Sequence, residues 1–260
     1  MIYLIYSVIK DRLNRLEVNK MATLEVYNNY SSAGIQSRSI TRGEEYDMVC
    51  EFIEYRKDAF KEKDDSHLAI FIETKINNSY PDIVFAEYNP ILYENWNQHR
   101  NKLSTNDFKI LFYILNHRNI TSQKIITNLS FNYKDLLLSL ENLYDAELID
   151  RKNGLWIRKP NLQFAVKRVE AVEAKISKWN IAIQQALINK SFASESSILY
   201  KRKFAPPDDL VDKIDQFGIG VYLYRDNMFS QIKKAKKGSL LTNYNSIYIN
   251  ECIGRIIHGY

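Results

Sequence analysis

The sequence predicts a mixed α/β protein, of the α+β kind, in which helices flank a core sheet and a second, mainly helical domain is inserted. Short runs rich in Ile, Val and Phe alternate with amphipathic runs, as expected for helices that pack on a sheet. Between two of the strand-like runs, the pattern changes to closely spaced helix starts and a hairpin turn. With 260 residues, 45% of them hydrophobic, the chain is long enough to bury such a core.

The first helix is predicted over residues 42–61. Thr41-Arg-Gly-Glu44 has the pattern of a capping box, in which the Thr hydroxyl and the Glu carboxylate satisfy the first helix amides. An amphipathic run follows it. We assign residues 1–40 to an N-terminal extension. Its apolar opening, Met1–Ile9, is too short to span a bilayer and lacks the basic start and cleavage site of a signal peptide.

Strands of the core are predicted where β-branched and aromatic residues cluster. Leu68–Ile76 and Asp82–Tyr88 are expected to form a hairpin, because an Asn-Asn-Ser turn separates them. Val172–Ile176 is a third strand, and the helix Ser177–Ser194 follows it directly. The remaining core elements are a strand at Ser197–Tyr200, a helix at Asp208–Gln216 and a strand at Gly220–Tyr224.

A segment of different character runs from about Ser104 to Ile157. Helix starts are predicted at Ser104, Thr121 and Asn132, with helix ends near Leu115, Leu129 and Ala146. Asn153-Gly154 then predicts a tight hairpin, because both residues readily adopt the positive φ angles of a type I′ turn. Three short helices and a two-stranded wing resemble a winged helix-turn-helix domain.

The chain therefore divides into the extension at 1–40, a core at 41–95 and 160–260, and an inserted domain at 100–159. Winged helices contact DNA or dock proteins, and both interpretations remain open here. The residues expected to contact DNA lie on the third helix and around the wing: Tyr133, Lys134, Arg151, Lys152 and Arg158.

The strand Val172–Ile176 carries a carboxylate and an amine two residues apart. In a strand, side chains at i and i+2 point the same way, so Glu173 and Lys175 share a face. A charged pair on a strand covered on both sides is costly to bury unless it has a partner or a role. One such role is to hold a divalent metal and a water beside a phosphodiester. The alternative is a half-buried strand whose Glu and Lys pair with their neighbours.

The order of these motifs resembles the PD-(D/E)xK nuclease superfamily, which has the restriction-endonuclease-like fold. Pro81-Asp82-Ile-Val-Phe is followed by Glu173-Ala-Lys175 and then by the helix Trp179–Ala193. The resemblance covers roughly residues 41–90 and 161–225. Asp82 and Glu173 are much farther apart in the sequence than the corresponding residues of this superfamily, which usually lie on a short hairpin. An insertion at the tip of a hairpin leaves the strand bases adjacent, so the site can survive it.

The resemblance implies a catalytic centre. Asp82, Glu173 and the carbonyl of Ala174 would bind Mg²⁺, or Mn²⁺, and Lys175 would orient or deprotonate the attacking water. Gln185 matches a position where relatives place a Gln beside the site, although it could equally lie on a solvated helix face. Glu45 is a further candidate ligand from the first helix, where a Glu also simply suits the helix dipole.

A second Glu-x-Lys motif, Glu73-Thr-Lys75, also lies on a predicted strand. Asp65 precedes it by a spacing that such nucleases often have. However, Asp65 belongs to a charge run that is most simply a solvated loop. The segment after Lys75 is a turn into Pro81 and not the helix that the fold requires, so we favour the Glu173 centre.

Composition agrees with an anionic partner. The net charge is +5 and the pI is about 8.9. The two cysteines, Cys50 and Cys252, lie far apart in the sequence, which suggests a reduced, cytoplasmic protein. No glycine-rich phosphate loop occurs. We expect a cytoplasmic, Mg²⁺-dependent endonuclease acting on double-stranded DNA in restriction or mobile-element defence, without a membrane partner and with homodimer formation left open. The alternative is a non-catalytic DNA-binding regulator or docking protein on a nuclease-like scaffold.

Overall fold

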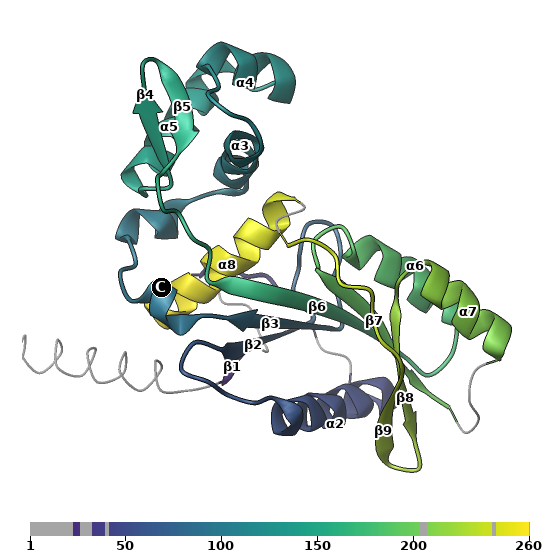
Figure 1. Cartoon of the computed structure of the whole chain (residues 1–260). Helices are drawn as coiled ribbons and strands as arrows, with labels where there is room; N and C mark the ends of the chain where they lie inside the picture. Colours follow the sequence, from purple (N-terminus) through teal and green to yellow (C-terminus); the bar gives the residue numbers. More distant parts are fainter. Residues whose placement is uncertain (1–22, 27–32, 40–41, 203–206, 241–242, 260) are drawn as a thin grey trace, which may run out of the picture.

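The computed structural model describes residues 23–26, 33–39, 42–202, 207–240 and 243–259 (Figure 1). Within these ranges, seven strands form one sheet in the order β1-β2-β3-β6-β7-β8-β9, and β4 pairs with β5 in a separate two-stranded sheet. The large sheet contains both parallel and antiparallel neighbours and is flanked by helices, so the mixed α/β class predicted from the sequence is confirmed.

The strands of the large sheet are β1 (Thr23–Val26), β2 (His67–Ile72), β3 (Ile83–Tyr88), β6 (Val166–Lys175), β7 (Glu195–Lys201), β8 (Gly220–Arg225) and β9 (Met228–Lys233). β2, β3 and β6 are antiparallel neighbours, whereas β6, β7 and β8 are parallel. Parallel strands need crossover connections, which α6 (Trp179–Asn189) and α7 (Asp208–Gln216) supply. β3 and β6 are adjacent although the inserted segment separates them in the sequence.

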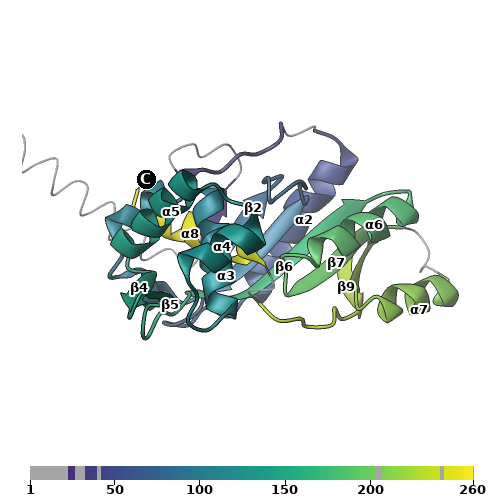
Figure 2. The same cartoon turned by 90° about the horizontal axis from the view of Figure 1, so that it is seen from above.

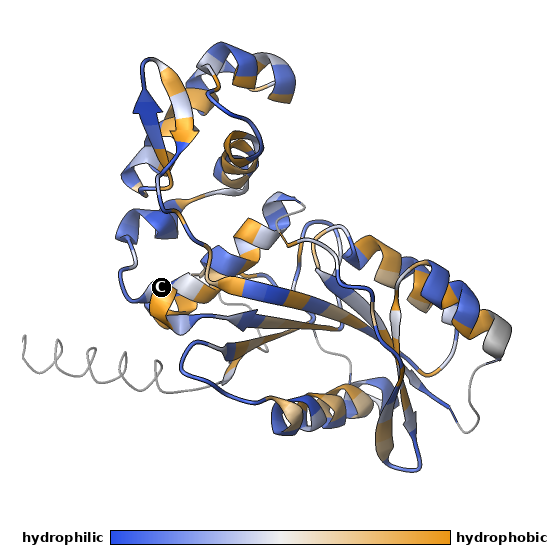
Figure 3. Cartoon of the chain, in the orientation of Figure 1, coloured by the Kyte–Doolittle hydropathy of each residue, from blue (hydrophilic) through white to orange (hydrophobic). Residues whose placement is uncertain are grey.

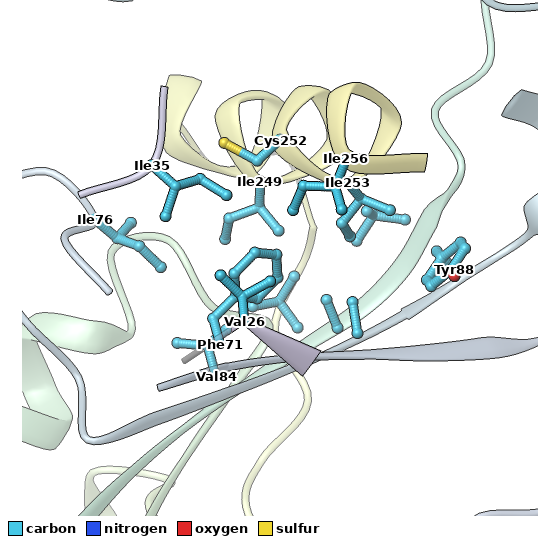
Figure 4. Close-up of a cluster of buried hydrophobic side chains, with 14 of the residues drawn as sticks. Val26, Ile35, Phe71, Ile76, Val84, Tyr88, Ile249, Cys252, Ile253 and Ile256 are labelled. Carbon is cyan, nitrogen blue, oxygen red and sulfur yellow. The ribbon is translucent and has the colours of Figure 1, made fainter. Parts of the chain in front are cut away.

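Helices cover both faces of the large sheet. α2 (Glu44–Ala59) packs on one face, and α6 and α8 (Tyr244–Ile257) pack on the other (Figures 1 and 2). Side chains alternate between the two faces along each strand, so Ile70 packs under α2 and Phe71 packs under α8. Figure 4 shows Ile249 and Ile253 of α8 above Phe71 in this second core. No helix of the described ranges is long and apolar enough to cross a membrane.

The inserted segment folds as three helices and a hairpin: α3 (Thr105–Asn116), α4 (Ser122–Leu129), α5 (Tyr133–Asp145), β4 (Ile149–Lys152) and β5 (Leu155–Arg158). Two short 3₁₀ helices, at Pro90–Tyr93 and Gln98–Lys102, lead into it. The N-caps are the predicted Ser104, Thr121 and Asn132, each of which accepts a hydrogen bond from a helix amide. β4 is largely hydrophilic and β5 largely hydrophobic (Figure 3).

The insertion has its own hydrophobic core but also contacts the sheet domain. Ile247 of α8 is buried in that core, and Phe108 of α3 lies 6.2 Å from Tyr248 of α8 between ring centroids. In Figure 1, the insertion lies beyond α8, on the side of the sheet opposite α2. The turn residues Asn153 and Gly154 have the predicted positive φ angles of 52° and 78°.

Several predicted elements need correction. The first helix begins at Glu44 with Gly43 as its N-cap and has no side-chain cap, while Thr41 lies outside the described residues. β2 ends at Ile72, because Glu73 has a φ of 49° that breaks the extended chain. β6 extends over ten residues instead of the predicted five. Its first half, Val166–Glu170, contains three charged residues without strict alternation, so neither an apolar run nor an alternating pattern revealed it in the sequence.

Besides the two 3₁₀ helices, two strands and one α-helix were not predicted. β1, within the stretch assigned to an N-terminal extension, pairs in parallel with β2 at the edge of the sheet; the rest of 1–40 is described only at 33–39. β9 pairs with β8, where the sequence predicted no strand. α8 is buried on nearly all sides, so it lacks the polar stripe by which an amphipathic helix is recognised.

Candidate functional site

Two carboxylates face each other at one end of the β3–β6 pair. Ile83 of β3 pairs with Val172 of β6, so the next residues outward, Asp82 and Glu173, stand opposite each other. The Cβ atoms of directly opposed residues are about 5 Å apart. Both side chains are buried, with Asp82 5% and Glu173 2% exposed. The sheet therefore brings together the two acidic residues that the insertion separates in the sequence.

The ammonium of Lys175 gathers three oxygen atoms around it. Its Nζ donates to Asp82 Oδ2 at 2.9 Å, to the Ala174 carbonyl at 2.6 Å and to Glu45 Oε1 at 3.2 Å. The Ala174 amide donates to Asp82 Oδ2 at 2.7 Å. Glu45 comes from the first turn of α2, so the site joins this helix to the two strands.

Glu173 is held from the opposite side by α6. The Asn189 side-chain amide donates to Glu173 Oε1 at 2.7 Å, and Asn189 is fully buried. Glu173 Oε2 is also buried but has no hydrogen-bond partner among the described residues. Asn189 thus fixes one oxygen of Glu173 in position, and a protonated Glu173 can share its proton with the neighbouring Asp82 carboxylate.

The surroundings raise the pKa of both ionisable groups at the centre, which favours neutral Glu173 and charged Lys175. Burial, reinforced by the charge of Asp82, raises the pKa of Glu173 to about 8. Burial lowers the pKa of Lys175, but the charges of Asp82, Glu45 and Glu173 outweigh it, so the net shift is upward. Near pH 7, Lys175 is therefore charged, and Glu173 retains a proton that a cation placed between the two carboxylates would displace.

A cavity of about 120 Å³ opens beside Asp82. Arg38, Glu45 and Glu73 line its polar side. Arg38 Nη2 donates to Glu73 Oε2 at 2.6 Å and lies 3.8 Å from Asp82 Oδ1. Burial raises the pKa of Glu73, against the effect of the Arg38 hydrogen bond. Glu73, from the second Glu-x-Lys motif, is therefore a neighbour of the centre.

The other members of that second motif lie elsewhere. Asp65 precedes β2 and Glu73 follows it, so the six-residue strand separates them by about 20 Å. Asp65 accepts a hydrogen bond from Lys167 at 2.9 Å, and Lys75 Nζ lies 3.5 Å from Gln36 Oε1. These three residues do not form a common site.

Gln185 and Asn189 lie one turn apart on α6, the helix that the sequence placed after Glu173-Ala-Lys175. Gln185 is half-buried, and its Oε1 is buried without a partner among the described residues, so it does not lie on a solvated face. Asn189 was missed by the sequence analysis. Its spacing of four residues from Gln185 places both side chains on one helix face, and this signal could have identified it.

The chain offers few protein ligands for a metal. Among the residues that the structure describes, no group of three or more His, Cys, Asp or Glu side chains is arranged to hold a metal ion. Binding would therefore depend on Asp82, Glu173 and the Ala174 carbonyl, completed by water. The oxygens that surround the Lys175 ammonium are of the kind that Mg²⁺ prefers, so the residues present fit a hard divalent cation.

The residues predicted to contact DNA are exposed on the insertion. Tyr133 is 64% exposed at the start of α5, beside the exposed Lys134. Arg151 and Lys152 lie on β4, and Arg158 ends β5. The Arg151 guanidinium stands over the Trp156 ring at 5.4 Å. All five side chains are accessible to a partner, and none contributes to the Asp82–Glu173 centre.

No protein-family model matches the chain, and comparisons with curated proteins and with solved structures find no match. A functional assignment therefore depends on the fold and on the geometry of the site.

Proposed function

We propose that the chain is a Mg²⁺-dependent DNA endonuclease of the PD-(D/E)xK class. The observation that carries the proposal is the meeting of Asp82, Glu173 and Lys175 at one end of β3 and β6. A structural ion pair needs no second carboxylate, and burying one beside Asp82 is costly. An arrangement that loses stability in this way is typical of a site that binds a cation or reacts.

The architecture supports the same class. α6 follows Glu173-Ala-Lys175 directly and packs on the sheet, as in the restriction-endonuclease-like fold that the sequence resembles. The insertion has the helix order and hairpin of a winged helix. Its exposed basic side chains suit contacts with duplex DNA.

The roles of the residues follow from their positions. Asp82, Glu173 and the Ala174 carbonyl would hold Mg²⁺ or Mn²⁺, with Glu45 as a further acidic neighbour. A bound ion would neutralise phosphate charge and make a water more acidic. Because its pKa is raised, Lys175 acts as a charged donor that orients the phosphate and the attacking water, not as the base that deprotonates it. Asn189 fixes the direction of Glu173.

Incubation of the purified protein with plasmid DNA and Mg²⁺ tests the proposal. Wild-type protein should cut the plasmid, whereas Glu173→Ala and Lys175→Ala should lose cleavage by roughly a hundredfold or more while keeping most DNA affinity. Glu73→Ala should do much less. Asp82→Asn should be inactive, whereas its matched control Asp65→Asn should keep its cleavage activity. If Glu73→Ala or Asp65→Asn abolishes cleavage and Glu173→Ala does not, the centre is wrongly assigned.

A non-catalytic DNA-binding protein is the second candidate. The observation that favours it is that the Lys175 ammonium already donates three hydrogen bonds, to Asp82, Ala174 and Glu45. Such a network can hold α2 on the sheet without any metal. DNA binding without cleavage in Mg²⁺, Mn²⁺ or other divalent metals would support this candidate over the nuclease.

A further inference from the structure

A large cleft lies between the sheet domain and the insertion. Its volume is about 560 Å³. It is bordered by α3, by the start of α8 and by the turn after Lys75. We propose that this interdomain cleft binds backbone phosphates of the DNA strand that reaches the Asp82–Glu173 centre. This inference rests on the proposed nuclease function and assigns it a substrate path.

The charge of the cleft suits a phosphate. Lys75 and Lys109 line it, and no Asp or Glu is among its lining residues. Lys109 Nζ lies 5.5 Å from the centre of the Tyr244 ring, which keeps its charge at the cleft wall. A cavity with two ammonium groups and no carboxylate favours an anion over a cation or an apolar ligand.

Two helices direct their N-termini at the cleft. Thr105, the first residue of α3, and Tyr244, the first of α8, are both lining residues. These helices have 12 and 14 residues. The N-terminus of a helix carries a partial positive charge and attracts phosphate oxygens. In α3 the Asp107 carboxylate of the capping box already offsets this charge. The first turn of α8 has no acidic residue, and Asn243 caps one of its amides, so α8 attracts a phosphate more strongly. Here the two termini meet the two lysines at one place.

A buried amide points independently to a ligand oxygen. Asn245 is 3% exposed and lines the cleft. Its Nδ2 is buried and has no hydrogen-bond partner among the described residues. Buried donors are nearly always paired, so this one indicates an acceptor outside the described residues, and a phosphate oxygen in the cleft would serve as one.

The cleft continues to the catalytic centre along two paired segments. The Arg38 amide donates to the Glu73 carbonyl at 2.9 Å, and the Lys75 amide donates to the Gln36 carbonyl at 2.7 Å. Arg38 and Glu73 line the small cavity beside Asp82, whereas Gln36 and Lys75 line the cleft. Two residues of chain span at most about 7 Å. A DNA strand held in the interdomain cleft would therefore lie within a short distance of the Asp82–Glu173 centre.

Equilibrium binding of a fluorescent 20-base-pair duplex in EDTA, across a salt series, tests the inference without cleavage. Lys75→Gln and Lys109→Gln should each weaken binding several-fold and reduce the salt slope by about one unit. Asn245→Asp should weaken it roughly tenfold, since it adds a carboxylate to the cleft while an acid in the first turn suits the helix. Lys213→Gln, an exposed lysine of α7, is the matched control and should bind as wild type.

The outcomes separate this inference from the nuclease proposal. Circular dichroism first shows that the three cleft variants are folded. If the wild-type protein cuts DNA but the variants bind the duplex with wild-type affinity, the cleft assignment is overturned and the nuclease stands. If wild-type protein binds the duplex but never cuts DNA, the nuclease fails, and the variants still decide the cleft. Absence of any duplex binding by the wild type overturns the cleft assignment, whereas cleavage of plasmid DNA in Mg²⁺ still decides the nuclease.

Discussion

A carboxyl group buried beside another carboxylate favours its protonated form, and Glu173 is such a group. Its pKa rises from 4.5 to about 8. Between these values the folded protein binds more protons than the unfolded chain, so the free energy of unfolding falls as pH rises. The contribution of Glu173 is complete below about pH 4.5 and is lost as pH rises through about 8. The centre therefore destabilises the fold most at the alkaline end of this range.

Glu173→Gln should remove this pH dependence. The amide keeps the acceptor for Asn189 but cannot ionise, so the variant should exceed the wild type in stability at pH 8 by on the order of 1–3 kcal/mol. The advantage should vanish near pH 4.5. Urea unfolding in EDTA across this pH range measures it, with the exposed Glu54→Gln as control. Parallel pH profiles for Glu173→Gln and wild type would refute the assigned shift.

Asn189 offers a second test at the scale of one residue. Asn189→Leu should lower the apparent Mg²⁺ affinity in cleavage roughly 10- to 100-fold, because Glu173 loses the donor that orients it. Gln184→Leu, an exposed position on the same helix, should have no such effect. Magnesium titrations of cleavage, with thermal unfolding as a check on folding, measure the difference. Equal magnesium requirements would show that Asn189 does not position the ligand.

At the scale of elements, locally encoded features could be predicted, whereas most features that depend on long-range packing could not; the adjacency of Asp82 and Glu173 was the exception, expected from the family resemblance. The helix starts at Ser104, Thr121 and Asn132 were found because a cap and its amide lie within three residues. α8 was missed because its identity as a helix depends on burial by the sheet and the insertion. The contact between Asn189 and Glu173 was missed because it joins a helix to a strand across 16 residues.

The role of the wing can be tested as one element. Changing Lys134, Arg151 and Lys152 together to Ala should weaken duplex binding and flatten its salt dependence. With each phosphate contact that is lost, binding displaces fewer counterions from the DNA. Part of the affinity should remain through the sheet domain. Fluorescence anisotropy across a salt series measures both quantities. An unchanged affinity and slope would identify the insertion as a protein-docking module.

At the scale of the whole molecule, α8 joins the two domains. Buried Arg255 donates to the carbonyls of Leu103 at 2.7 Å, Arg100 at 3.0 Å and Ala33 at 3.2 Å. Glu251, one turn earlier, pairs with Arg100 at 2.5 Å. The helix thus connects the sheet core to the segment that leads into the insertion. Removal of one partner of such a buried pair leaves an uncompensated charge, so the joint resists separation.

Because α8 is closely packed, adding a single methyl group to it should lower the stability of the protein. A Cβ added at Gly254 would stand 2.2 Å from the Trp96 ring. Gly254→Ala should therefore lower the free energy of unfolding by about 1–3 kcal/mol, although alanine favours a helix. Gly43→Ala, where an added Cβ meets nothing within 4 Å, is the control. Equal urea midpoints for Gly254→Ala and wild type would contradict this packing.

The ten-residue strand β6 begins where the insertion ends and finishes at Lys175. It spans about 33 Å, which is close to one turn of B-form DNA. Helices cover both faces of the sheet, so a duplex cannot lie on β6 itself. The strand instead fixes the separation between the base of the insertion and the Asp82–Glu173 centre. For the proposed nuclease, one duplex that contacts both the insertion and the centre would have to span at least about one helical turn.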